Sequence, residues 1–216
     1  MSGARLVDAN LTGATLDEAN LTGANLCGAD FTRASLVRAT LRDATCLAGG
    51  SAHPAVFVDA SMAAAELLGA ELTRADLHGA DLTGANLYEA TLHLANLRGA
   101  TLPRANLDGA NLRHAELEGA VFSEANLATA DLAKARARGA SFSGASLRRA
   151  NLAGAQLDEV DLSRADLTEA DLERASLRGA DLRGAALTLA ELDETVLEGA
   201  KLDGVDLSAC RNYRQQ

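Results

Sequence analysis

The chain has 216 residues, a formal net charge of −10, no tryptophan and only 3% aromatic residues. With so few aromatic side chains a conventional globular core would be short of bulk, so the apolar residues must be organised in another way. A net acidic chain with scattered arginines also lacks the continuous basic face that binds a duplex, which argues against DNA and RNA as direct ligands.

A five-residue phrase repeats through most of the chain. It is most regular from Ala75 to Thr129, where it begins ADLHG, ADLTG, ANLYE, ATLHL and ANLRG. On an α-helix, leucines five apart would fall about 140° from one another, and the alternation of a strand cannot stay in step with a period of five. Within each phrase, however, Ala and Leu lie two residues apart, as on one face of a short extended segment, and turn-forming residues follow. Each phrase therefore predicts one short side and one corner.

Four such sides with right-angled corners would close a square of twenty residues, and successive squares would stack about 4.8 Å apart. The Ala and Leu side chains would then meet along a central axis. Ala137 replaces a leucine on this axis, and we expect the larger Phe122 and Phe142 beside it to fill the space that it leaves. The core residues predicted in the regular part are Leu72, Leu77, Leu82, Leu87, Phe122, Ala137 and Phe142.

The phrase A(D/N)LXX resembles the repeat of the pentapeptide repeat proteins, and the resemblance covers nearly the whole chain. It implies an all-β fold, a right-handed quadrilateral β-helix of about ten 20-residue coils. For function it points to non-catalytic binding, because the best-studied relatives are the Qnr-type and mycobacterial fluoroquinolone-resistance proteins, which imitate DNA and bind gyrase.

In chain order, residues 1–48 form the N-terminal coils, with nine phrases from Ala4 to Ala48. The N-terminus shows neither a basic region followed by an apolar run nor a membrane-spanning length, so we expect a cytoplasmic protein. Cys27, Cys46 and Cys210 are an odd number without metal-ligand spacing, which favours reduced thiols.

Residues 49–54, Gly-Gly-Ser-Ala-His-Pro, interrupt the repeat with one residue more than a phrase. Glycine and proline favour a bulged corner or small loop that takes the place of one side. A hinge between two stacks is the alternative. The main β-helix follows from residue 55 to 209, with thirty-one phrases, and residues 210–216 form a tail too short for a capping helix. The resemblance also implies a homodimer through the end coils.

Residues twenty apart should lie side by side on neighbouring coils. Asn86, Asn106 and Asn126 form one such column, where stacked amides can build a hydrogen-bonded ladder. We expect this ladder to be structural.

The sequence offers little for catalysis. His53, His78, His93 and His114 are present, and only His93 and His114 map to nearby corners. No Cys or second pair completes a metal-ligand set. There is no arguable Ser-His-Asp trio and no phosphate-binding loop between a strand and a helix. We therefore expect no enzyme activity, no cofactor and no metal.

Charge is distributed unevenly along the chain. Residues 127–150 hold five basic residues against one acid, a local +4, whereas residues 151–210 hold fourteen acids against five basic residues, a local −9. Carboxylates should gather on one side of the late coils, either tolerated through solvent screening or retained for a partner. The candidate partner-binding acids are Asp171, Glu173, Glu191, Asp193 and Glu194.

These features leave two functions open. An acidic rod of about 48 Å could imitate DNA, and the resemblance implies DNA gyrase or topoisomerase IV as its partner, although a duplex of that length carries roughly 28 phosphate charges. The chain also lacks the two longer loops of the Qnr group. The alternative is a general protein-interaction scaffold that uses an outward apolar pair, Leu68 and Tyr88.

Overall fold

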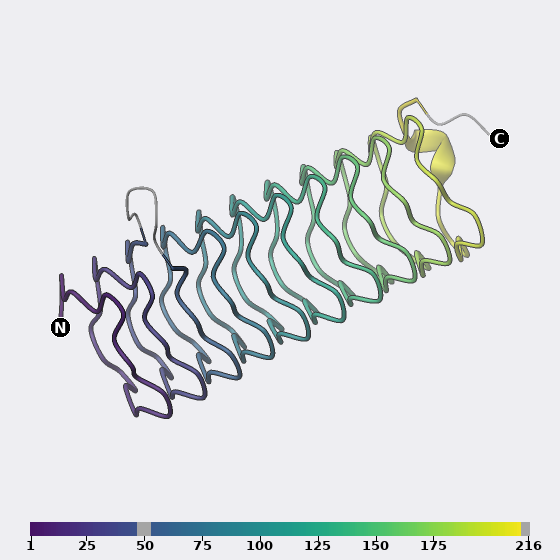
Figure 1. The fold of residues 1–216 in the computed structure, drawn as a ribbon. Coiled ribbons are helices and arrows are strands. Elements are labelled where there is room, and N and C mark those ends of the chain that lie inside the picture. Colours follow the sequence, from purple (N-terminus) through teal and green to yellow (C-terminus); the bar gives the residue numbers. More distant parts are fainter. Residues whose placement is uncertain (47–52, 213–216) are drawn as a thin grey trace.

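The computed structural model describes residues 1–46 and 53–212 of the protein. The chain winds into a rod of stacked coils, with the purple N-terminal coils and the yellow last coils at opposite ends (Figure 1). Its sheets consist of isolated parallel bridges, which outside the interruption near the N-terminal end join residues twenty apart, for example Asn86 to Asn106 and Asn106 to Asn126. This register confirms the predicted square of twenty residues. In the described ranges the only helix is η1, a 3-10 turn at Leu207–Ala209.

The hydrogen bonds of a single phrase explain why Asp or Asn precedes Leu. In the phrase that begins at Ala75, four of the five backbone N–H groups donate to backbone carbonyls of the neighbouring coils or of the preceding corner. The fifth, on His78, donates to Oδ1 of Asp76 at 3.1 Å. The short carboxylate or amide side chain thus accepts a hydrogen bond from the one backbone N–H group of the phrase that has no backbone carbonyl as its acceptor. The other four bonds run from Ala75 to Leu72, from Asp76 to Ala55, from Leu77 to Asn96 and from Gly79 to Arg98.

Each corner is a tight turn closed by a hydrogen bond from the Ala N–H to the preceding Leu carbonyl, as between Ala80 and Leu77 at 3.0 Å. The third residue of the turn has a positive φ. Glycine adopts this conformation at little cost, but side-chain-bearing residues do so as well, including Leu94 at 59° and Leu189 at 60°. The corners therefore hold strained residues that the stacking around them keeps in place.

The apolar axis runs through the stack. The predicted core residues Leu72, Leu77, Leu82, Leu87, Phe122, Ala137 and Phe142 are all at most 1% exposed. Phe122 and Phe142 stack face to face, with ring centroids 4.8 Å apart and planes 2° from parallel. Phe31 and Phe57 stack in the same way. The rings thus follow the same column geometry as the leucines.

The interruption near the N-terminal end is accommodated differently from our expectation. Bridges join Asp30 to Val56 and Thr40 to Glu66, a separation of 26 residues instead of twenty. Six residues are therefore additional to the four sides, and the prediction that the segment takes the place of one side is wrong. The sides before and after it pair directly, as in one continuous stack.

The regular path resumes earlier than the sequence suggests. The His53 carbonyl accepts the Gly28 N–H at 2.7 Å, a contact that the fourth residue of a regular phrase makes. His53 and Pro54 therefore complete the side that begins at Ala44. The bulge or loop predicted for 49–54 falls largely on residues 47–52, which lie outside the described residues.

Candidate functional site

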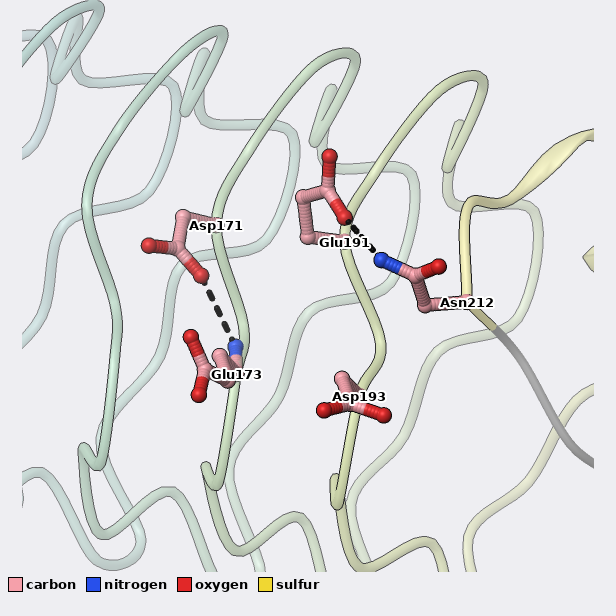
Figure 2. Close-up of a pocket in the computed structure, with 5 residues that line it drawn as sticks. All are labelled: Asp171, Glu173, Glu191, Asp193 and Asn212. Carbon is pink, nitrogen blue, oxygen red and sulfur yellow. Dashed lines mark hydrogen bonds between the residues drawn. The ribbon is translucent and has the colours of Figure 1, made fainter.

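The carboxylates predicted near the C-terminal end come together on one face of the stack. Asp171, Glu173, Glu191 and Asp193 line a surface groove of about 290 Å³ together with Asn212 (Figure 2). A parallel bridge places Asp171 beside Glu191 on the next coil. These four side chains occupy the second and fourth positions of their phrases, which point outward because the first and third point into the core.

Hydrogen bonds fix part of this groove. Oδ1 of Asp171 accepts the backbone N–H of Glu173 at 2.9 Å, the same contact that Asp or Asn makes in the regular phrase. Glu191 accepts from Nδ2 of Asn212 at 2.8 Å. Both bonds are visible in Figure 2, where the carboxylate of Asp193 stands apart from them. We call these four acids, together with Glu194 on the adjoining corner, the acidic groove.

The acidic groove is only partly neutralised. Arg174 contacts Glu173 at 3.0 Å and Glu194 at 2.7 Å, and Arg211 contacts Glu191 at 3.3 Å. Five carboxylates against two guanidinium groups leave a local charge of −3. Within the described ranges Asp171 and Asp193 have no ion-pair partner. Repulsion between such neighbours is weakened by solvent, and a cationic group would relieve it.

The basic stretch at 127–150 forms no basic face, because acids on neighbouring coils pair with it. Arg149 contacts Glu169 at 3.0 Å, and its hydrogen bond holds the pKa of that carboxyl below the ordinary value. The remaining contacts are Arg136 to Glu116 and Glu118, Arg138 to Glu159, and Arg148 to Asp166. The local charge of +4 in the sequence of residues 127–150 is therefore largely neutralised by acids on neighbouring coils.

The predicted asparagine ladder is confirmed. Nδ2 of Asn126 donates to Oδ1 of Asn106 at 3.1 Å, and Nδ2 of Asn106 donates to Oδ1 of Asn86 at 3.2 Å. Asn86 in turn donates to Glu66 at 2.9 Å. These amides are engaged with one another, so the column acts as a structural element.

The apolar pair Leu68 and Tyr88 lies on adjacent coils, since the Gly69 N–H donates to the Tyr88 carbonyl at 2.9 Å. Tyr88 is 36% exposed and Leu68 is half-buried. A hydrogen bond with Glu89, the charge of Glu89 and that of Asp108 raise the pKa of Tyr88. Carboxylates thus border this pair, which keeps the apolar surface small.

The rings of His93 and His114 meet edge to face, with centroids 5.8 Å apart. In the part of the chain that the structure describes, no three or more His, Cys, Asp or Glu side chains are arranged to hold a metal ion. No helix in that part is long and apolar enough to cross a membrane.

The cysteines differ from our expectation. Cys27 and Cys46 form a disulfide, with their Cα atoms 4.6 Å apart, so the prediction of reduced thiols is wrong for this pair. The Asn25–Thr45 bridge aligns the two sides that carry these cysteines, so Cys27 and Cys46 are diagonal neighbours on adjacent coils. Cys210 is free, and burial raises the pKa of its thiol.

Sequence reasoning also missed Asn212 as a lining residue, because the phrases end at Ala209. The twenty-residue register was the available signal, since Glu191 pairs with Arg211 in the structure. Pairing thus continues to Arg211, within the segment 210–216 that the sequence predicts to be a short tail.

Short sides, tight corners and an apolar axis define the protein as a quadrilateral β-helix. The profile of the Pentapeptide repeats family matches residues 4–44 and, in overlapping segments, residues 55–209. The chain belongs to the pentapeptide repeat family, whose members fold as right-handed quadrilateral β-helices.

The chain is also similar to proteins of known structure. HetL, a pentapeptide repeat protein involved in heterocyst differentiation regulation from Nostoc sp. strain PCC 7120, is 34% identical, with a TM-score of 0.54 over 94% of this chain and 86% of its own. QnrB1, a plasmid-mediated fluoroquinolone resistance protein, is 18% identical, with a TM-score of 0.40 over 96% of this chain and 93% of its own. A search of curated protein sequences finds no match.

Proposed function

We propose that this protein is a non-catalytic binding protein that presents the acidic groove to a basic surface of a partner protein, in the manner of a short DNA mimic. The observation that supports this function is the gathering of four carboxylates on one face of consecutive coils, with Glu194 on the adjoining corner and only two guanidinium partners. Because the β-helix holds these carboxylates at a fixed spacing, little ordering cost remains for binding.

For the partner we propose a bacterial type II topoisomerase, DNA gyrase or topoisomerase IV, whose DNA-binding surface is basic. Such a partner would place the protein in the cytoplasm. A local charge of −3 is small beside the roughly 28 phosphates of a 48 Å duplex, so the imitation is confined to a short contact. Electrostatic attraction of this kind acts mainly on the association rate and weakens as salt is added.

A supercoiling assay tests this proposal. Micromolar protein should inhibit gyrase supercoiling or rescue it from a quinolone, and Asp171→Lys with Glu191→Lys should weaken the effect about tenfold or more. A matched control is Glu71→Lys with Asp131→Lys, which changes the net charge equally at the same phrase position of earlier coils on the same face. No effect of the wild-type protein, or equal loss in both variants, would contradict the proposal.

A second function is a regulatory scaffold that binds a protein other than a topoisomerase. The similarity to HetL favours it, because that relative is described as taking part in regulation. The outward pair Leu68 and Tyr88 would then supply the contact. A pull-down that survives Asp171→Lys with Glu191→Lys but is lost on Tyr88→Asp would support the scaffold against the DNA mimic.

A further inference from the structure

The Cys27–Cys46 disulfide lies where the regular path of the chain is interrupted. The bridge between Asn25 and Thr45 aligns the two sides that carry these cysteines on neighbouring coils. The loop that the bond closes, residues 27–46, is one complete coil. On the far side of the interruption, the His53 carbonyl accepts the Gly28 N–H at 2.7 Å and lies 3.4 Å from Sγ of Cys46. The bond therefore joins the start and the end of one coil.

We propose that Cys27 and Cys46 form a reversible thiol–disulfide clamp that holds the coil of residues 27–46 closed and opens under reducing conditions. With a peroxide as the oxidant, each thiol loses one hydrogen, the S–S bond forms and hydrogen peroxide becomes two waters. With a dithiol as the reductant, one thiolate of the dithiol attacks the protein disulfide and forms a mixed disulfide. The second thiol of the dithiol then attacks this mixed disulfide, so the reductant becomes a cyclic disulfide and both cysteines return to thiols.

The positions of the three cysteines support this assignment. Cys27 is only 2% exposed, whereas Cys46 is half-buried, so an incoming thiolate would attack Sγ of Cys46 and release Cys27. Cys210 lies at the other end of the chain, on the last coil, where its Sγ is 3.3 Å from the Leu187 carbonyl. It is therefore too remote to resolve the bond within one molecule.

We expect reduction of the disulfide to lower the stability of the coil formed by residues 27–46. In a stack, each coil contacts only its neighbours, so coils near an end open more readily than those in the middle. Cys46 occupies the inward column between Leu26 and Leu72, where a thiol fills less volume than leucine. The disulfide compensates by preventing the coil from unwinding, since it limits the conformations of the unfolded loop.

Hydrogen exchange on the full-length protein tests the clamp. Free thiols are counted in the denatured protein by their reaction with a chromogenic disulfide, with no reductant present. We expect one free thiol per chain after treatment with peroxide. After treatment with dithiothreitol we expect three. Peptides within residues 27–46 should exchange about tenfold faster or more in the reduced protein, whereas peptides within 75–129 should not change.

Two variants sharpen this experiment. Cys46→Leu restores the regular column, so exchange in residues 27–46 should no longer respond to the reductant. Cys210→Ser leaves the pair intact and should keep the wild-type response. Three free thiols after peroxide treatment, or identical exchange of residues 27–46 in the two redox states, would overturn the proposal.

Discussion

At the scale of single residues, Gly28 has the least room of the corner glycines in the described ranges. Its φ is +68°, and a Cβ atom there would lie 2.0 Å from Oδ1 and 3.4 Å from the Cα of Asp8. Gly84 has a similar φ of +63°, but a Cβ atom would meet nothing within 4 Å. Both alanine substitutions carry the cost of a left-handed residue, and only Gly28→Ala adds a clash. We expect Gly28→Ala to lower the free energy of unfolding by about 1 kcal/mol more than Gly84→Ala in urea titrations, and equal losses would contradict this.

Asp181 gives a prediction about pH. Hydrogen bonds from Arg183, with Nε at 2.9 Å from Oδ1 and Nη2 at 2.6 Å from Oδ2, lower its pKa to about 2. Because the folded-state pKa lies below the unfolded value, the stabilising effect of the carboxylate is complete above about pH 4 and is lost as pH falls through about 2. In Arg183→Gln the pKa of Asp181 should rise toward 3.8 in an NMR titration. An unchanged midpoint would show that Arg183 does not hold the carboxylate.

At the scale of the coil, Ala137 tests the packing of the axis. It is fully buried in a column that is otherwise mostly leucine, and Phe142, whose ring stacks on that of Phe122, occupies the core position of the next side. If these rings fill the space, Ala137→Leu overpacks the core and should lower the free energy of unfolding by about 1 to 3 kcal/mol, with a lower melting temperature. Thermal unfolding that shows a neutral or stabilising effect would refute this compensation.

Elements governed by the twenty-residue register could be predicted from the sequence. The asparagine ladder and the gathering of Asp171 beside Glu191 both follow from counting twenty residues, because each coil repeats the backbone positions of the one before. The extra six residues could not be placed in this way. Glycine and proline mark an interruption, but which residues return to the regular path depends on the Gly28 to His53 hydrogen bond, a tertiary contact. The disulfide was missed for the same reason.

At the scale of the whole molecule, the structure separates a uniform interior from a varied surface. The interior repeats alanine and leucine along one axis, and substitutions there change stability. The surface carries balanced charge where arginines pair with acids across coils, as between Arg98 and Glu118 at 3.2 Å, and a net negative charge at the acidic groove. A rigid stack of this kind presents its charges at fixed spacing, which is why we propose a binding function.

Residues twenty apart lie on successive coils of one face throughout the regular part of the stack. Bridges connect Glu71 to Asp171 through Thr91, Asn111, Asp131 and Asn151, so these two positions are five coils apart. Spin labels at Glu71→Cys and Asp171→Cys, in a Cys210→Ser background with the disulfide intact, measure the separation directly by double electron–electron resonance. We expect one narrow distance distribution centred near about 24 Å, five times the coil spacing. A broad distribution, or a distance that differs by more than about two coil spacings, would contradict the stacked arrangement.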